Sequence, residues 1–343
     1  MKEMTGLAEP YLQTLLGLEL SVIRYTLIAE ERFDVAHDLS PTLRGALGWA
    51  MSELGCLGEC PRAHSGAPAQ RARTRRGHRE GPERDCKVSG CPYARSFLGK
   101  GWPEQGLRVL PQSYRICGPV ALEPSTYLRG DELSFELTLF GAGADYALYW
   151  TLAMIRAAAR GLGGARRGFY LAEAHDRLSG ALLYERGRPL APLSVSREPL
   201  SALIAPPPEA WAPAGALELT LQTPLLLREL PERPALSILS RAVMRRLHAL
   251  YARFQAPLAH PLSADELDAR ARAQVSGSLG WREQHRRSSS SRGAVPQSGH
   301  VGTLTYHELS SPLWAHQLLS AGALIGIGQQ TNMGLGRYQL KVL

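Results

Sequence analysis

The chain has 343 residues, of which 44% are hydrophobic, and its 39 basic and 31 acidic side chains give a formal charge of +8. This composition argues against wholesale disorder, because so hydrophobic a chain can bury a core, and the length fits one large or two ordinary domains. No apolar run approaches the roughly 18 residues of a membrane span, and Glu3, Glu9 and Pro10 interrupt the only candidate signal peptide. We therefore expect a cytoplasmic protein without a membrane partner.

All but four of the basic residues are arginine. Arginine grips phosphates with two parallel hydrogen bonds and stacks on bases, so the bias favours a nucleic-acid partner. A GC-rich genome produces the same bias, and the bias alone therefore does not decide.

The first part of the chain predicts one β-α-β-β-α-β series. Leu18–Ile28 is an apolar, β-branched run that is typical of a central strand. A helix is predicted to begin at Ser40, with Pro41 in its first position, and to end near Leu54. Alternation and helical spacing predict the other elements, which are strands at Val109–Cys117 and Glu132–Phe140, a helix at Tyr146–Arg160, and strands at Phe169–Ala174 and Ala181–Arg186.

The second part repeats this order after a proline-rich linker at residues 206–214. Its predicted elements are a strand at Ala216–Leu227, a helix at Leu236–Phe254, strands at Leu279–Arg287 and His300–Leu309, a helix at Leu313–Ala323 and a strand at Gly336–Val342. We therefore predict an α+β fold of two tandem ferredoxin-like (RRM-like) domains, residues 1–205 and 215–343. The first domain carries an arginine-rich insertion at about residues 56–104.

A glycine-rich loop separates the last helix from the last strand. Gly326, Gly328, Gly334 and Gly336 permit positive φ angles, and we expect successive N–H groups of this loop to be free for an anion, with Arg337 beside them. The spacing does not match a dinucleotide fingerprint, and no helix and second strand follow to complete one. A plain tight turn is the alternative.

Four cysteines could form a structural zinc site, since Cys56 and Cys60 make one pair and Cys86 and Cys91 another. The pair spacings are looser than those of a zinc ribbon, and reduced thiols are the alternative.

Three groups of basic residues are candidates for RNA binding. The insertion between the cysteine pairs contributes Arg62, Arg71, Arg73, Arg75, Arg76, Arg79 and Arg84. A predicted basic hairpin contributes Arg282, His285, Arg286, Arg287 and Arg292. Arg241 and Arg245 lie one turn apart on the predicted helix of the second domain, off its apolar face. Solvated surface loops are the alternative for the first two groups.

RNA cleavage without a metal needs groups near the 2′-hydroxyl and the leaving oxygen, and positive charge on the phosphate. His37 just precedes the predicted first helix and Arg44 lies in its first turn, so we expect both to face one groove. Arg24, near the end of the first strand, could join them.

Three motifs, LRGALGWAMSELGC, HRRSSSSRG with GHVGTLTY, and GIGQQTNMGLGRYQL, together resemble the CRISPR repeat-processing endoribonucleases of the RAMP superfamily. The arginine-rich insertion resembles that of their type IV branch. The resemblance implies RNA between two ferredoxin-like domains and metal-independent attack of a 2′-hydroxyl at the 3′ base of a repeat stem-loop. It also implies a 2′,3′-cyclic phosphate product, retention of the guide RNA, and other CRISPR effector subunits as partners.

The resemblance places the glycine loop near the scissile strand and the catalytic histidine of many members in the first helix. This chain departs from that pattern, because no histidine lies within residues 40–54 and His37 only precedes them. Some members use arginine instead, so Arg24 and Arg44 remain catalytic candidates beside His37, and no catalytic cofactor is implied. The alternatives are a non-catalytic RAMP subunit that binds guide RNA and a zinc-containing DNA-binding protein.

Overall fold

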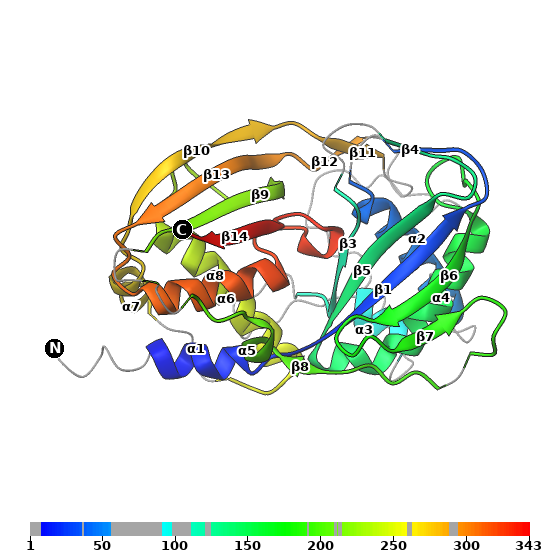
Figure 1. The fold of residues 1–343 in the computed structure, drawn as a ribbon, viewed down its shortest axis with the longest axis horizontal. Helices are drawn as coiled ribbons and strands as arrows, with labels where there is room; N and C mark the ends of the chain where they lie inside the picture. Colours follow the sequence, from blue (N-terminus) through cyan, green and yellow to red (C-terminus); the bar gives the residue numbers. More distant parts are fainter. Residues whose placement is uncertain are drawn as a thin grey trace, which may run out of the picture.

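The computed structural model describes residues 8–35, 38–55, 91–97, 111–120, 125–190, 192–208, 211, 215–258, 263–287 and 294–343. They form two large antiparallel sheets, each covered on one face by helices, and two small two-stranded sheets, β2-β4 and β11-β12 (Figure 1). The predicted α+β class with two tandem ferredoxin-like units is confirmed. The predicted insertion, apart from residues 91–97, lies outside the described residues.

The first sheet has the strand order β3-β5-β1-β6-β7, and the short β8 also pairs with β1. Its elements are β1 (Glu19–Ala29), α2 (Ser40–Gly55), β3 (Tyr114–Cys117), β5 (Glu132–Phe140), α4 (Ala147–Arg160), β6 (Phe169–Asp176), β7 (Leu182–Glu185) and β8 (Glu198–Pro199). Side chains alternate along β1, so that Ile23, Tyr25 and Leu27 enter the core with residues of α2 and α4, whereas Arg24 is exposed. The two faces of this sheet therefore differ, one being packed on helices and the other turned away from them.

The second sheet has the strand order β10-β13-β9-β14. Numbered along the chain within each half, its strands lie in the order second, third, first, fourth, as do β3-β5-β1-β6 of the first sheet, and this is the ferredoxin-like arrangement. Its elements are β9 (Leu217–Leu225), α6 (Leu236–Phe254), β10 (Gln274–Arg282), β13 (Gly299–His307), α8 (Pro312–Ile325) and β14 (Tyr338–Val342). Leucines of β9 and α6 share one buried cluster with Leu304 and Tyr306 of β13. The amphipathic spacing of α6 places its apolar side on the sheet.

The main correction to the predicted elements concerns the second strand of the second sheet. The strand expected at Leu279–Arg287 begins at Gln274 and ends at Arg282, and the chain then forms a separate hairpin of β11 (His285–Arg287) and β12 (Ala294–Pro296). The helices α1 (Ala8–Leu16) and α7 (Ala264–Arg270) were not predicted. Smaller elements are β2 (Phe33–Val35), α3 (Pro92–Phe97), β4 (Ser125–Tyr127), η3 (Gly141–Tyr146), α5 (Leu200–Leu203) and η4 (Thr331–Met333).

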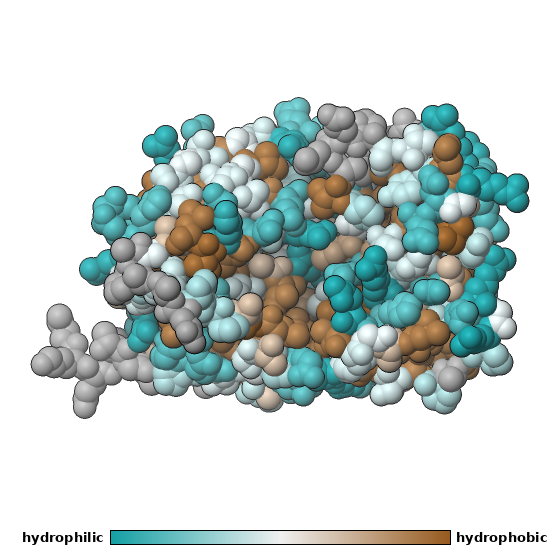
Figure 2. Space-filling view, viewed as in Figure 1, coloured by the Kyte–Doolittle hydropathy of each residue, from teal (hydrophilic) through white to brown (hydrophobic). Residues whose placement is uncertain are grey.

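The two halves are joined by packing as well as by the chain. Leu12, Leu15 and Leu16 of α1 lie in the same hydrophobic cluster as the second sheet, although α1 precedes the first. The Arg253 side chain of α6 donates a hydrogen bond of 2.8 Å to the carbonyl of Pro111. Hydrophobic side chains are also exposed in the middle of the face shown in Figure 2, and both ends of this face mix hydrophilic and hydrophobic ones. The domain boundary at residues 206–214 stays a prediction.

Among the described helices, none is both long and apolar enough to cross a membrane.

Candidate nucleic-acid interface

The glycine loop, residues 326–336, runs from the end of α8 to the start of β14. Gly326, Gly328, Gly334 and Gly336 have φ angles of 74°, 83°, 82° and 67°, which are the left-handed values that the sequence suggested. A methyl group on Gly328 would lie 2.7 Å from the carbonyl oxygen of Leu226, and one on Gly334 would lie 2.5 Å from Oγ of Ser40. The loop therefore needs glycine both for its backbone angles and for close packing.

The expectation that successive N–H groups of this loop are free for an anion was wrong for much of the loop. The N–H of Ile327 donates to Gly336, that of Gln329 to Leu226, and that of Gly336 to Pro224. Gly326, Met333 and Gly334 also donate to carbonyls of the chain, and the N–H of Arg337 donates to Thr223. The loop folds back on β9 and satisfies these donors internally, because a buried N–H without a partner is costly.

The glycine loop is seated on the start of α2, which belongs to the other half of the molecule. Ser40 donates from both its N–H and its hydroxyl to Oδ1 of Asp38, at 2.9 and 2.7 Å, and its hydroxyl oxygen accepts from the N–H of Gly118 at 2.8 Å. Gly334 packs directly on this group. Burial raises the pKa of the Asp38 carboxyl, whereas the bonds from Ser40 and the charge of Arg337 act in the opposite direction. These contacts set the position of the loop relative to α2.

Two arginines hold the end of α8, where the glycine loop begins. Arg115 of β3 donates from Nη1 to the carbonyls of Ala323 and Leu324, at 3.0 and 2.8 Å, and Arg246 of α6 donates to that of Ile325 at 3.1 Å. The last carbonyls of a helix lack partners within it, and a cation there is also favoured by the helix dipole. Burial, and to a lesser extent the charge of Arg115, lowers the pKa of Arg246 to about 9, so its guanidinium stays charged at neutral pH. Sequence reasoning missed both residues.

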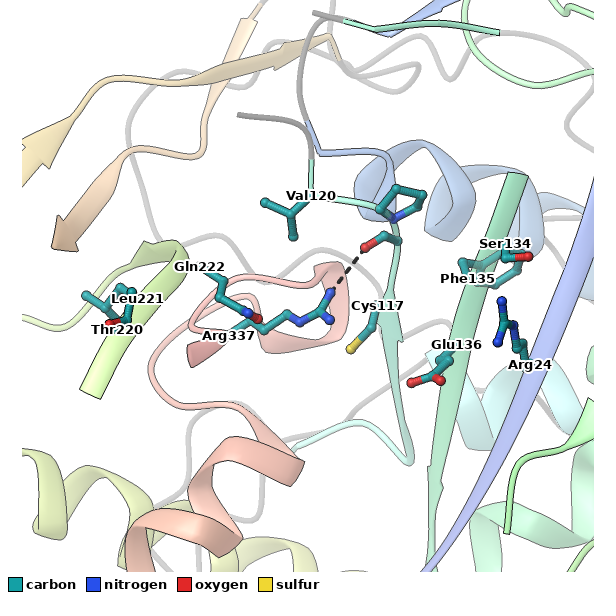
Figure 3. A pocket seen from close by; sticks show the side chains of 12 residues that line it. Arg24, Cys117, Val120, Ser134, Phe135, Glu136, Thr220, Leu221, Gln222 and Arg337 are labelled. Atoms are coloured by element: carbon teal, nitrogen blue, oxygen red, sulfur yellow. Dashed lines mark hydrogen bonds between the residues drawn. The ribbon is translucent and has the colours of Figure 1, made fainter. Parts of the chain in front are cut away.

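A hollow of about 660 Å³, which we call the sheet cleft, lies between the two sheets (Figure 3). Arg24 of β1 and Glu136 of β5 line it from the first sheet, and Gln222 and Arg337 line it from the second half. The Nη1 atom of Arg337 donates to the carbonyl of Gly118 at 3.3 Å. One guanidinium from each half thus faces this cleft, and a guanidinium can bind a phosphate through two parallel hydrogen bonds.

A second hollow of about 410 Å³, which we call the α2 pocket, lies at the start of α2. It is lined by Pro41 and Thr42 of α2, by Asp38, by the turn after α4, and by the hairpin that carries His285. Its further lining residues are Arg32, Phe33, Asp34, Val35, Leu39, Gly163, Gly164, Ala165, Arg167, Gln284 and Gln297. Gln297 is buried and donates to the sulfur of Met333 at 3.9 Å, so the glycine loop borders this pocket too.

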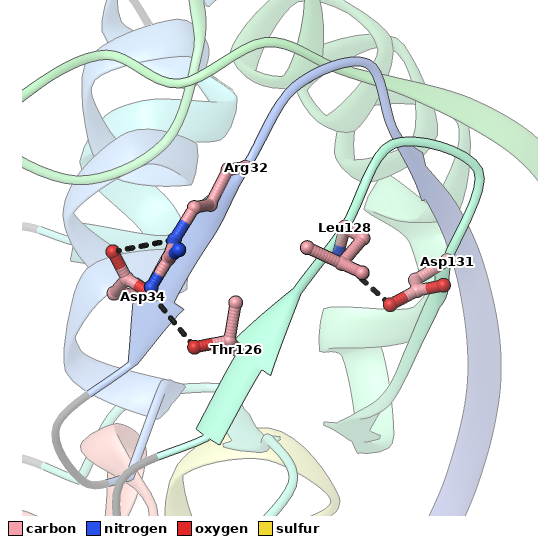
Figure 4. A network of polar contacts seen from close by, with 5 residues as sticks. All are labelled: Arg32, Asp34, Thr126, Leu128 and Asp131. Atoms are coloured by element: carbon pink, nitrogen blue, oxygen red, sulfur yellow. Dashed lines mark hydrogen bonds and ion pairs between the residues drawn. The ribbon is translucent and has the colours of Figure 1, made fainter.

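The arginines of the α2 pocket are held by exposed carboxylates. Arg32 pairs with Asp34 at 3.0 Å, and Asp34 also accepts from Thr126 of β4 at 2.7 Å (Figure 4). Arg167 pairs with Glu31 at 2.8 Å. Exposed ion pairs of this kind contribute at most about 1 kcal/mol, so an incoming phosphate can replace the carboxylate at little cost.

Arg24 and Arg44, two of the three predicted catalytic residues, do not meet in one groove. Arg24 faces the sheet cleft, on the side of the first sheet that turns away from α2. Arg44 faces α3, where its Cζ lies 5.5 Å from the Phe97 ring centre, and it lines neither hollow. His37 lies outside the described residues, but its neighbour Asp38 lines the α2 pocket. The strand alternation of β1 explains the separation of Arg24 from α2.

The other predicted RNA-binding residues are dispersed. Arg245 lies beside Gln329 of the glycine loop in a further hollow of about 860 Å³, whereas Arg241 lies 3.6 Å from the Asp268 carboxylate on α7. Arg282 is exposed at the end of β10, and His285 is exposed on the predicted hairpin, which is confirmed by the pairing of His285 with Pro296. The backbones of Arg286 and Arg287 belong to β11. The insertion arginines Arg62, Arg71, Arg73, Arg75, Arg76, Arg79 and Arg84, and also Arg292, lie outside the described residues.

The zinc prediction is not tested by the geometry. Cys56, Cys60 and Cys86 lie outside the described residues, and Cys91 is buried at the start of α3. Within the described part of the chain, no three His, Cys, Asp or Glu side chains are grouped as a metal site.

Two family models match the chain one after the other. The AF_1859_N model, described as an N-terminal domain, matches residues 18–195, which is more than half of the chain. The model of the CRISPR-associated endoribonuclease Cas6 matches residues 219–338, from β9 through the glycine loop into β14. The chain is a Cas6-like protein. No curated protein sequence matches this Cas6-like chain significantly.

Solved structures share the Cas6-like fold. A chain of a partial Cas6-RT-Cas1–Cas2 complex superposes with a TM-score of 0.53 at 15% identity, over 95% of this chain and 46% of that one. A chain of the Cas6-RT-Cas1–Cas2 complex superposes with the same score and identity, over 95% of this chain and 29% of that one. The present chain thus spans less than half the length of either. A Cas6 product complex matches with a TM-score of 0.48 at 15% identity, over 94% of this chain and all of that one.

Proposed function

We propose that this chain is an endoribonuclease that cleaves CRISPR precursor RNA at the 3′ base of the repeat stem-loop, and that it keeps the mature guide RNA. The observation that carries the proposal is the packing of the Cas6-type glycine loop on the start of α2, between two hollows whose linings each include two arginines. The scissile phosphate lies in the α2 pocket. The RNA that continues from this phosphate, in the 3′ or the 5′ direction, enters the sheet cleft.

The proposed reaction is a transesterification without a metal. The 2′-hydroxyl attacks the adjacent phosphorus, the bond to the 5′-oxygen breaks, and the proton lost by the 2′-hydroxyl is balanced by one gained at the leaving oxygen. The products are a 2′,3′-cyclic phosphate and a 5′-hydroxyl. Arg32 and Arg167 stabilise the charge that develops on the phosphate, which is how positioned cations accelerate phosphoryl transfer.

His37 and His285 are the imidazoles that we propose for the proton transfers. His285 lines the α2 pocket, and His37 directly precedes Asp38, which does so too. Histidine is the side chain most often used to take or give a proton in catalysis near neutral pH. Where imidazole catalysis contributes little, cleavage depends on orientation and charge alone and is slow.

Cleavage of a repeat RNA in EDTA tests the proposal. The substrate carries a 3′-end label, and a matched RNA carries a single 2′-deoxy nucleotide at the cleavage position. We expect the first RNA to be cut once and the second to stay intact. Cutting of both RNAs, or of neither, contradicts the proposed chemistry; retention of uncut RNA with no product indicates a binding subunit instead.

We further propose that the chain works beside other CRISPR effector subunits and that Cys56, Cys60, Cys86 and Cys91 hold one structural zinc ion. Thiolate ligands in two pairs are the basis of the zinc proposal. Metal analysis of purified protein should find about one zinc per chain, and none in the quadruple Cys→Ser variant. Zinc that remains in this variant contradicts the assignment.

A further inference from the structure

Two arginines of α4 lie over the Trp49 ring of α2, and a third follows in the turn after α4. The Cζ atom of Arg160 lies 3.4 Å from the centre of the Trp49 ring, and that of Arg156 lies 5.9 Å from it. Arg166 follows in the turn after α4 and is exposed. We call Arg156, Arg160 and Arg166 the arginine ridge.

The ridge has too few carboxylates to balance its charge. Glu53 of α2 accepts from Arg156 at 3.0 Å, and among the described residues no carboxylate forms an ion pair with Arg160 or Arg166. Partial burial lowers the pKa of Arg160, and the charges of Arg166 and Arg156 lower it further, whereas the charge of Glu53 raises it. The ridge differs in this respect from Arg32 and Arg167, which both have a carboxylate partner. Like charges held close together repel one another, and a bound anion offsets this repulsion.

The turn that presents Arg166 is firmly built. Leu162 and Arg167 exchange backbone hydrogen bonds of 2.8 and 2.9 Å, and a methyl group on Gly161 would lie 2.2 Å from the carbonyl oxygen of Arg166. Arg166 itself has a φ angle of 50°, which is uncommon for a residue with a side chain. These backbone hydrogen bonds and the close approach at Gly161 fix the conformation of the turn, so the fold determines the position of Arg166.

The ridge is continuous with the α2 pocket. Gly163, Gly164, Ala165 and Arg167 of the same turn line that pocket. The dipole of α4 explains a cation at Arg160, in the last turn of the helix, but it does not explain Arg166 beyond the helix end.

We propose that the arginine ridge binds the phosphate backbone of the RNA duplex whose base lies at the α2 pocket. The ridge suits a duplex rather than unpaired bases, because Arg160 covers the Trp49 ring on which a base would otherwise stack. Contacts to phosphates hold a nucleic acid in register without reading its sequence. The inference rests on the proposed function and adds the surface that holds the stem.

Fluorescence anisotropy with two RNAs tests the ridge, the first a repeat stem-loop and the second an unstructured RNA of the same length and composition. The variants are R160A/R166A, R160K/R166K and R166E. The last of these keeps Arg160 on the Trp49 ring. The control R188A removes an arginine that is 70% exposed and pairs with Glu185. All proteins are compared at several salt concentrations, after thermal melting has shown that they are folded.

We expect R160A/R166A to weaken stem-loop binding by about fivefold or more, and to reduce the slope of log Kd against log salt by roughly one to two units. R166E should weaken it too, R160K/R166K should bind better than R160A/R166A, and R188A should bind as the wild type does. The unstructured RNA should respond much less than the stem-loop.

Equal Kd values and salt slopes for wild type and R160A/R166A, with wild-type cleavage intact, overturn the ridge and leave the proposed function standing. An equal loss for both RNAs overturns the assignment to duplex. If the wild-type protein binds no repeat RNA, the proposed function fails together with the ridge. Normal RNA binding by these variants, together with loss of a co-purifying protein, would assign the ridge to a protein partner instead.

Discussion

Replacement of Arg115 by alanine tests how the glycine loop is anchored. The Arg115 side chain is 2% exposed and donates to the carbonyls of Ala323 and Leu324 at the end of α8. It comes from the first sheet, whereas α8 belongs to the second half of the molecule. The substitution therefore removes a bond between the halves at the point where the glycine loop begins.

The expected cost follows from these contacts. A hydrogen bond from a charged donor contributes about 1.5–3 kcal/mol, and a polar group left without a partner costs about 1–3 kcal/mol. Relief of the repulsion between Arg115 and Arg246 offsets part of this loss. We therefore expect R115A to lower the free energy of unfolding by about 2–4 kcal/mol.

Urea denaturation followed by circular dichroism measures this change. The matched control is R177A, because Arg177 is 59% exposed and pairs with Glu136 of the first sheet at 3.4 Å, and a surface pair contributes at most about 1 kcal/mol. R115A should also slow RNA cleavage more than it weakens RNA binding, because it displaces the glycine loop. An unfolding free energy within about 0.5 kcal/mol of the wild type would refute the anchoring role.

Three further predictions concern the loop, the pH dependence and the catalytic candidates. G334A should destabilise the protein by more than the roughly 1 kcal/mol expected for G130A, and it should slow cleavage. Both glycines have a positive φ angle, but only Gly334 lies against Ser40. Equal losses of stability in the two variants would show that backbone strain alone is responsible. Burial lowers the pKa of His316 in the folded protein. As the pH falls, the unfolded chain therefore takes up the proton first, and stability decreases below about pH 6.5. H316Q should lose less stability than the wild type between pH 7 and pH 5 in the same denaturation assay, and an equal loss would contradict this assignment. At least one of H37A, H285A, R32A and R167A should slow single-turnover cleavage by more than about tenfold, and if none does, the placement of the catalytic groups at the α2 pocket is wrong.

Local patterns in the sequence predicted most of the fold. The predicted bounds of β5 and α6 agree with the structure, because strand alternation and helical spacing are both strong there. The helix α7 was missed although Ser263 and Glu266 form a capping box, which is a signal that the sequence does carry. α1 was missed because it is short and its leucines pack on a core built from the distant half of the chain.

The candidate site was harder to predict, because it depends on contacts between the halves. The positive φ angles of the glycine loop follow from residue type, but its hydrogen bonds to β9 and its packing on Ser40 do not. Arginine is rarely buried, so nothing in the local pattern marks Arg115 as buried or Arg246 as partly buried. The separation of Arg24 from Arg44 could have been foreseen, because Ile23 and Tyr25 flank Arg24 and are apolar, which places its side chain on the sheet face away from the helix.

Sequencing the RNA that co-purifies with the protein, together with chemical analysis of its 3′ end, tests the central claim most directly. We expect a uniform set of RNAs that carry one repeat stem-loop and end at its 3′ base in a 2′,3′-cyclic phosphate. RNAs of mixed sequence, or repeat RNAs that end in a 3′-hydroxyl, would contradict the claim.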